Sequence, residues 1–242
     1  MIVGGIDTLE YSIGVENYGE MLAKYIDGFE IYKLAAQEGP ETVNIDGIWF
    51  EATPAGIRNY AFGFKCEDFW LFFARKTTTR NYPVWVKVSS GGLWSLGIAE
   101  IAARVEKLLA SMGFRAITTK VSRVDLAVDT DELEFKPEDR ESCVTRGASI
   151  DVHETYGEFT GFTVGRGEPI MLRVYDKTRE VKKSGKDWMK WLWAANEWYG
   201  ERVWRVEFQC RRELMREMRV ETLAYSSESV HPFRSNPGSH SS

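Results

Sequence analysis

The chain has 242 residues, of which 43% are hydrophobic and 28% charged, and its net charge is −5; these values describe a globular protein with one large domain or two small ones. No window approaches the roughly 18 consecutive apolar residues of a membrane-spanning helix, which excludes such a segment. The three cysteines lie far apart without a CxxC pair, which excludes a disulfide scaffold and a zinc ribbon and favours a reducing, cytoplasmic location.

Hydrophobic periodicity divides the first half of the chain into strands and two helices. The predicted elements, in chain order, are a strand at 7–15, a helix at 18–36, strands at 42–53, 57–65, 68–77 and 83–89, a turn at 89–92 and a helix at 98–112. Gly113 is well placed to end the last of these helices.

The second half of the chain is predicted to contain more strands than helices. Its elements are a strand at 116–129, a loop or short helix at 132–141, strands at 148–153, 159–165 and 169–176, a Trp-rich helix at 186–198, a strand at 202–210 and a helix at 211–219. This order predicts an α+β fold with a central antiparallel sheet and helices packed on one face. We predict a single domain over residues 1–225. Residues 226–242 are rich in Ser, Pro and Gly, which predicts a disordered tail.

Charge is distributed unevenly along the chain. Residues 1–100 hold 13 acidic and 8 basic residues, whereas residues 161–219 hold 14 basic and 9 acidic residues. We therefore expect a polyanion such as DNA to bind the last third of the chain. The alternative interpretation is that these cations are solvated on helix faces. The candidate DNA-binding residues are Arg166, Arg179, Lys182, Lys183, Arg205, Arg211 and Arg212.

Three predicted strands carry charge on one face, because side chains two positions apart point the same way. The polar faces hold Arg123, Asp125 and Asp129 on one strand, Arg205, Glu207 and Gln209 on another, and Arg173, Tyr175 and Lys177 on the third. The opposite faces are apolar and are expected to pack against the core; they hold Val124, Leu126 and Val128, then Trp204, Val206 and Phe208, then Leu172 and Val174. If the strands are neighbours, the polar faces form one surface.

Such a surface could carry out phosphodiester chemistry. Carboxylates without other ligand types form an oxygen site that suits Mg²⁺ or Mn²⁺ and is poor for zinc. A phenol beside such a metal and cations could attack a phosphodiester and hold the 5′ phosphate covalently. The alternative is that the charges form cross-strand ion pairs on solvent-facing strands.

Two further features have simpler interpretations. His153 has no second histidine in reach, so we interpret it as a surface residue. The helix at 186–198 places Trp188, Trp191, Leu192 and Ala195 on one face. This stripe is predicted to be core or interface, with a platform for stacking DNA bases as the alternative.

Four segments resemble the trans-acting rolling-circle replication initiators of the plasmid and phage replication initiation factor family. The segments are GIDTLEYSI from Gly5, SRVDLAVD from Ser122, GFTVGRGEPIMLRVYDKTREVKKSGKDWM from Gly161 and VWRVEFQCRREL from Val203. The resemblance extends from about Asp7 to Val220 and implies a Rep nuclease-like fold. It implies an enzyme that nicks one DNA strand at a replication origin, stays joined to the 5′ phosphate and later reseals the strand.

Matched residue by residue, the resemblance implies that Tyr175 is the nucleophile, with Arg173 and Lys177 neutralising phosphate charge. It implies Mg²⁺ or Mn²⁺ ligands at Asp125 and Glu207, with Asp129 as a further candidate. The absence of a His-hydrophobe-His pair separates the chain from the HUH nucleases. The expected partner is origin DNA, as a hairpin or a single-stranded nick site, and a second copy of the chain and a host helicase are further candidates. The alternative function is a DNA-binding replication regulator that kept the fold without cleaving DNA.

Overall fold

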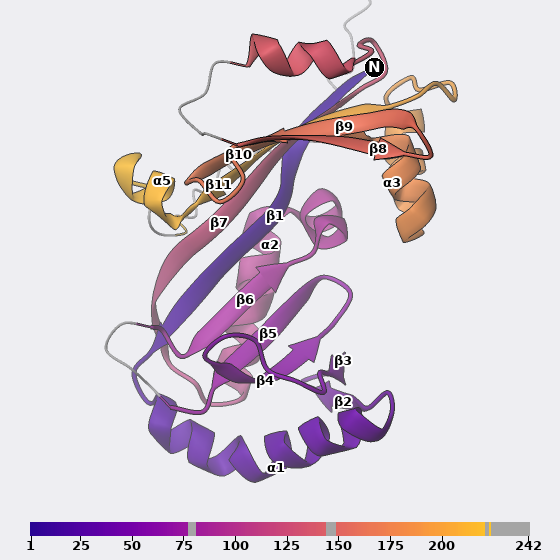
Figure 1. Ribbon diagram of the computed structural model, residues 1–242. Helices are drawn as coiled ribbons and strands as arrows, with labels where there is room; N and C mark the ends of the chain where they lie inside the picture. Colours follow the sequence, from indigo (N-terminus) through magenta and orange to yellow (C-terminus); the bar gives the residue numbers. More distant parts are fainter. Residues whose placement is uncertain (77–80, 144–148, 221–222, 224–242) are drawn as a thin grey trace, which may run out of the picture.

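The computed structural model describes residues 1–76, 81–143, 149–220 and 223 (Figure 1). Its strands are β1 (Ile2–Val15), β2 (Thr42–Ile45), β3 (Ile48–Ala52), β4 (Tyr60–Lys65), β5 (Phe69–Ala74), β6 (Val84–Val88), β7 (Ala116–Thr130), β8 (Ile150–Thr155), β9 (Glu158–Val164), β10 (Ile170–Asp176) and β11 (Trp204–Arg211). Its helices are α1 (Tyr18–Glu38), α2 (Ser90–Ser111), the 3-10 helix η1 (Pro137–Ser142), α3 (Lys177–Ser184), α4 (Trp188–Ala194) and α5 (Arg212–Glu217).

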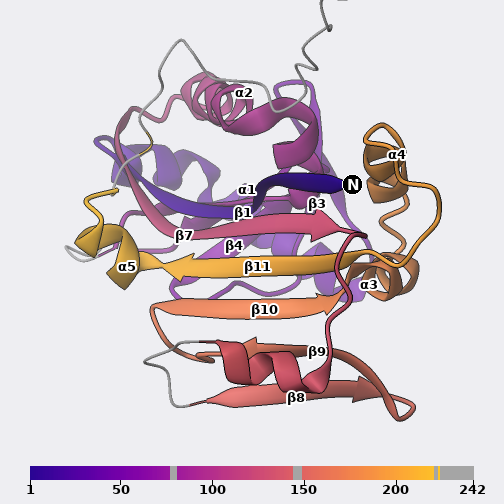
Figure 2. The ribbon, with the colours of Figure 1, turned by 90° about the horizontal axis from the view of Figure 1, so that it is seen from above.

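All the strands of the described chain join one antiparallel sheet, in the order β2-β3-β4-β5-β6-β1-β7-β11-β10-β9-β8. The long strands β1 and β7 run through both ends of the molecule and connect the two halves of the sheet (Figure 1). Seen from above, β7, β11, β10, β9 and β8 lie side by side (Figure 2). The predicted α+β class with a central antiparallel sheet is confirmed.

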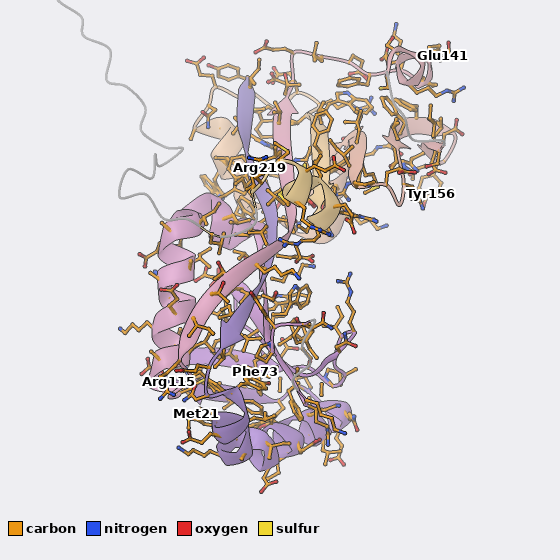
Figure 3. All side chains as sticks on the ribbon, turned by 90° about the vertical axis from the view of Figure 1, so that its left-hand side faces the viewer. Met21, Phe73, Arg115, Glu141, Tyr156 and Arg219 are labelled. Carbon is orange, nitrogen blue, oxygen red and sulfur yellow. The ribbon has the colours of Figure 1, made fainter. Side chains whose placement is uncertain are left out.

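The larger core lies between the first half of the sheet and helices α1 and α2. The ring of Phe29 on α1 lies 4.9 Å from that of Phe64 and 5.0 Å from that of Phe73, centroid to centroid. Met21 and Phe73 both lie in this lower part of the molecule (Figure 3). None of the helices in the described part of the chain has the length and apolarity needed to cross a membrane.

A second, smaller core positions helices α3 and α4 at the other half of the sheet. Trp193 of α4 is fully buried there, together with Val181 of α3, Val3 of β1 and Trp94 of α2. The indole N–H of Trp193 donates a hydrogen bond to Asp129 of β7 at 2.8 Å. Helix α4 therefore lies against the charged face of β7, whereas α1 and α2 pack in the larger core.

Several predicted boundaries in the first half differ from the structure: β1 begins at Ile2 instead of position 7, and two larger differences have a clear local cause. The run at 42–53 forms two strands, because Asp46 and Gly47 adopt positive φ angles of 52° and 82° and make a tight hairpin turn. The predicted turn at 89–92 is instead the start of α2, where the Ser89 hydroxyl accepts a hydrogen bond from the backbone N–H of Gly92 at 3.0 Å. The two segments of α2 meet at a kink at Gly97.

The sequence prediction missed α3. The Asp176 carboxylate caps this helix by accepting a hydrogen bond from the backbone N–H of Arg179 at 2.9 Å. The chain therefore leaves the sheet at Asp176, and Lys177 begins a helix instead of continuing the strand. The predicted Trp-rich helix is shorter than expected and spans Trp188–Ala194. The tail predicted at 226–242 lies outside the described residues.

The burial of the three charged strands agrees with the expectation only in part. Val174 of β10 and Trp204 of β11 are buried in a small core, as predicted. The apolar side chains of Leu126, Val128 and Phe208 are 47%, 41% and 41% exposed, so the prediction that these three pack against the core is wrong. On the charged face, by contrast, Asp125 and Glu207 are fully buried. The physical reason is that α4 and a network of arginines cover and neutralise the charged face, while η1 and its flanking segment reach only the part of the apolar face around Trp204.

Candidate active site

The three charged strands are neighbours, as the site prediction requires. The sheet order places β11 between β7 and β10. Arg205 of β11 pairs with Asp129 on one side and with Tyr175 on the other, and Glu207 pairs with Arg173. The polar faces therefore form one surface, and its charges are organised as two arginine-centred groups.

The first group is centred on Arg205, which is fully buried. Its Nε lies 2.5 Å from Asp129 Oδ1 and its Nη1 lies 2.6 Å from Asp7 Oδ1. Asp7 comes from β1, where the register shift between Ile6 and Thr8 leaves it unpaired and directs it into the group. Burial by itself would raise the pKa of Asp7, but the charges of Arg205, Lys177 and Lys186, with the hydrogen bond from Arg205, together lower it.

The second group surrounds Arg173. This guanidinium contacts Glu207 Oε1 and lies 3.5 Å from Asp125 Oδ2, so one nitrogen stands between two carboxylates. Asp125 is also held by Arg123, whose Nε donates to Oδ1 at 2.8 Å. The buried acids are thus each compensated by an arginine, as low-dielectric surroundings require.

Tyr175 joins the two groups. Its hydroxyl donates a hydrogen bond to Glu207 Oε2 at 3.0 Å, leaving Oε1 for Arg173. Burial raises the pKa of Tyr175 well above its ordinary value, although Arg205 and Arg173 act in the opposite direction. Gly161 faces the tyrosine across the sheet, and a Cβ there would lie 2.8 Å from the Tyr175 Cα, so only glycine leaves the space.

Lys177 lies beside the tyrosine but is held by the first turn of α3. Its Nζ is 2.5 Å from Glu180 Oε2 and 5.6 Å from the centroid of the Tyr175 ring. Burial lowers the pKa of Lys177, and the nearby charge of Arg205 lowers it further. Lys177 therefore lies beside Tyr175, although at the start of a helix and not on a strand face as predicted.

A pocket of about 380 Å³ opens over this surface. Tyr175, Glu207 and Lys177 line it, together with residues that sequence reasoning did not assign: Asp7, His153, Thr163, Glu180 and Lys186. His153 was interpreted as a surface residue, yet its Nε2 lies 2.8 Å from the Thr163 hydroxyl on the pocket wall. For Asp7 the sequence did hold a signal, because this residue lies in GIDTLEYSI, one of the four segments that resemble the replication initiators. The others are brought to the pocket by β8, β9, α3 and the connection between α3 and α4.

The carboxylates differ in how well they fit a metal ion. Asp125 and Glu207 both approach one nitrogen of Arg173, so one cation can reach both of them. Asp129 is bound through both oxygens by Arg205 and by Trp193, which is the arginine pairing that the sequence left open. Within the described residues, no three His, Cys, Asp or Glu side chains converge on a metal position. The two remaining acids are of the type that Mg²⁺ or Mn²⁺ binds together with substrate phosphate and water, but arginines pair with both and only Glu207 lines the pocket, so a metal at this position stays a prediction.

The candidate DNA-binding residues divide into exposed and internal ones. Lys182 and Lys183 are exposed on the last turn of α3, and Arg166, which pairs with Asp151, is also exposed. Arg205 is fully buried in its ion pairs, so the prediction that it contacts DNA from the surface is wrong: its charge is already used by two carboxylates.

The other arginines of this set hold neighbouring parts of the protein. Arg179 pairs with Glu158 and lies 3.7 Å from Asp176. Arg211 and Arg212 donate to backbone carbonyls at 3.0 and 2.9 Å. DNA contacts from these arginines stay a prediction.

Comparisons with known proteins give one structural likeness to report. No protein-family model matches the sequence, and no curated protein sequence matches it. Among solved structures, the chain is similar to one described as the rolling circle replication initiator protein from Geobacillus stearothermophilus. The TM-score is 0.47, with 15% identity over 91% of this chain and 79% of that chain. A similarity of this degree does not indicate what the chain does, so the function proposed below is based on the residues of the site.

Proposed function

We propose that this protein initiates rolling-circle replication by nicking and rejoining one DNA strand through a covalent link between Tyr175 and the 5′ phosphate. The observation that carries the proposal is the hydrogen bond from the Tyr175 hydroxyl to buried Glu207, in a pocket also lined by Arg173, Lys177 and Lys186. A phenol, a base and several cations in one pocket are the groups that transfer of a phosphodiester requires.

The chemistry follows from the contacts of Tyr175. Because burial raises its pKa, the phenol is neutral and needs a base to become a nucleophile. Glu207 Oε2 accepts the hydrogen bond and is placed to take the proton as the phenol oxygen attacks phosphorus. The bond between phosphorus and the 3′ oxygen then breaks, and that oxygen takes up a proton from water to leave a free 3′-OH, while Glu207 releases the phenol proton to solvent. Lys177 and Arg173 would neutralise the phosphate charge.

A divalent cation is the second component of the proposal. Asp125 and Glu207 Oε1 would hold Mg²⁺ or Mn²⁺ jointly with the DNA, in place of their present contacts with Arg173. The ion would supply polarisation of the scissile phosphate. In this arrangement Glu207 keeps its second oxygen for the tyrosine, so a single carboxylate serves both tasks. Asp129 acts instead through Arg205, which it holds in place beneath Tyr175.

The test is formation of a covalent protein–DNA adduct. Labelled single-stranded oligonucleotides tiled across the protein's own replicon are incubated with the full chain and Mn²⁺, then resolved on a denaturing gel. Wild type should form an adduct, and Tyr175→Phe should form none while binding the same oligonucleotides with wild-type affinity. Tyr156→Phe is the matched control, because Tyr156 is fully exposed at the turn between β8 and β9 (Figure 3).

Two outcomes would contradict the proposal. Normal adduct formation by Tyr175→Phe would remove the tyrosine from the reaction. Binding of single-stranded DNA without any adduct from wild type, across all tiled oligonucleotides, would favour the alternative of a DNA-binding regulator.

A further inference from the structure

A second pocket, of about 600 Å³, lies next to the candidate active site between the start of α2 and helix α4. Three indoles line it: Trp94 from α2, and Trp188 and Trp191 from α4. Leu192 and Ala195 complete the α4 side, so this wall is the stripe that the sequence predicted to be core or interface. Leu192 is also buried in the smaller core with Met189 and Trp193, and Trp188 packs against that core, whereas Trp191 and Ala195 are exposed, so the stripe is part core and part pocket wall.

Two side chains of this pocket bear on what it could hold. Trp191 is 79% exposed and lies on the same pocket wall as the half-buried Trp188, so two indoles of the α4 region line the pocket. Trp94 is buried, and its indole N–H has no hydrogen-bond partner among the described residues. A buried donor without an acceptor is costly, but this nitrogen is itself inaccessible, so Trp94 is assigned only an apolar wall of the pocket and its N–H is not assigned to a ligand.

The two pockets are adjacent. Lys186 lines both of them, since it lies in the short connection between α3 and α4. Its Nζ is 3.7 Å from Glu180 Oε1 and its side chain is only partly buried, so it can reach a phosphate on the boundary. A strand whose scissile phosphate lies at Tyr175 would therefore pass Lys186 and bring its next residues to the indoles.

We propose that the tryptophan pocket binds an unpaired nucleobase of the DNA strand whose phosphate occupies the active site. Indoles stack on any base, because every base presents a π-face, and a pocket of this volume accommodates a nucleotide-sized ligand. The acidic rim of Glu67 and Asp68 repels backbone phosphates and so favours entry of the base, while Lys186 holds the phosphate outside. This inference rests on the proposed nicking function for the identity of the strand, and the pocket itself can be tested without nicking.

The test compares single-stranded DNA with and without bases. Affinities for dT12 and for a dodecamer of abasic residues are measured by fluorescence anisotropy, with the full chain carrying Tyr175→Phe. That protein should bind dT12 about tenfold or more tightly than the abasic strand, because stacking provides the difference. Trp191→Ala and Trp188→Ala should each weaken dT12 binding about tenfold and leave abasic binding unchanged. The matched control is Trp49→Ala, an exposed tryptophan on β3 near the far edge of the sheet.

The results separate this inference from the proposed function. If both α4 variants bind dT12 with the affinity of the parent protein, the tryptophan pocket does not bind a base. This holds even if Tyr175 of the wild-type protein forms adducts normally. A base-dependent affinity that Trp191→Ala and Trp188→Ala remove, together with a wild-type protein that never forms an adduct, would support the pocket and overturn the nicking function. Equal loss of dT12 and abasic binding in the α4 variants would also contradict base binding in the tryptophan pocket, since stacking cannot act on a strand without bases.

Discussion

Replacement of Arg205 by leucine should destabilise the protein strongly at neutral pH. The guanidinium is fully buried and contacts two carboxylates, Asp7 and Asp129, at 2.5–2.8 Å. Its removal leaves both acids buried without their counter-charge. Removing one partner of a buried ion pair costs about 3–5 kcal/mol, a large fraction of the about 5–15 kcal/mol that holds a typical protein folded. In a domain of this size the melting temperature should fall by roughly 6–20 °C.

The cost should also depend on pH in a defined direction. Arg205 holds the pKa of Asp7 below its ordinary value of 3.8, against the opposing effect of burial. The pair therefore stabilises the folded state above that pH and loses its contribution as the pH falls through the lowered pKa. The difference in unfolding free energy between wild type and Arg205→Leu should be largest at pH 7 and should narrow below about pH 4.

Urea denaturation followed by tryptophan fluorescence measures both effects. Arg115→Leu is the control, because its pair with Glu16 is exposed on both sides and such pairs contribute at most about 1 kcal/mol. An Arg205→Leu protein no less stable than Arg115→Leu at pH 7 would refute the reasoning that the buried network holds the charged face together. A gap that widens on acidification would refute the assigned role of Asp7.

Four further predictions concern the site and its DNA. Asp125→Asn or Glu207→Gln should lower nicking by orders of magnitude and weaken Mn²⁺ binding in calorimetry. If both variants bind Mn²⁺ with wild-type affinity and nicking survives EDTA, these acids are only ion-pair partners. Asp129→Asn should lower stability and leave Mn²⁺ affinity unchanged, and a loss of Mn²⁺ binding there would add it to the ligands. Gly161→Ala should destabilise the fold and lower adduct formation, since a Cβ would lie 2.1 Å from the Val174 carbonyl oxygen; a crystal structure with an undisplaced tyrosine would contradict this. Binding to single-stranded DNA should weaken steeply between 50 and 200 mM salt, as counterion release requires, and a flat dependence would exclude a phosphate-tracking surface.

The sequence alone determined which side chains of the site share a face. The period of two in RVDLAVD, LRVYD and WRVEFQ places Asp125 with Asp129, Arg173 with Tyr175, and Arg205 with Glu207, and this follows from strand geometry whatever the rest of the chain does. The antiparallel α+β class also followed from the local patterns, because strand and helix periodicities are properties of short segments.

Tertiary structure decided which face of these strands is covered. Periodicity separates two faces but does not say which one meets the interior, and here the charged face is buried while Leu126 and Phe208 are half exposed. That outcome depends on partners far away in the chain: Asp7 reaches Arg205 across 198 positions, and Trp193 reaches Asp129 across 64. Only long-range packing can supply the compensation that makes buried charge tolerable, because the ion pairs exist only after the strands and α4 have assembled.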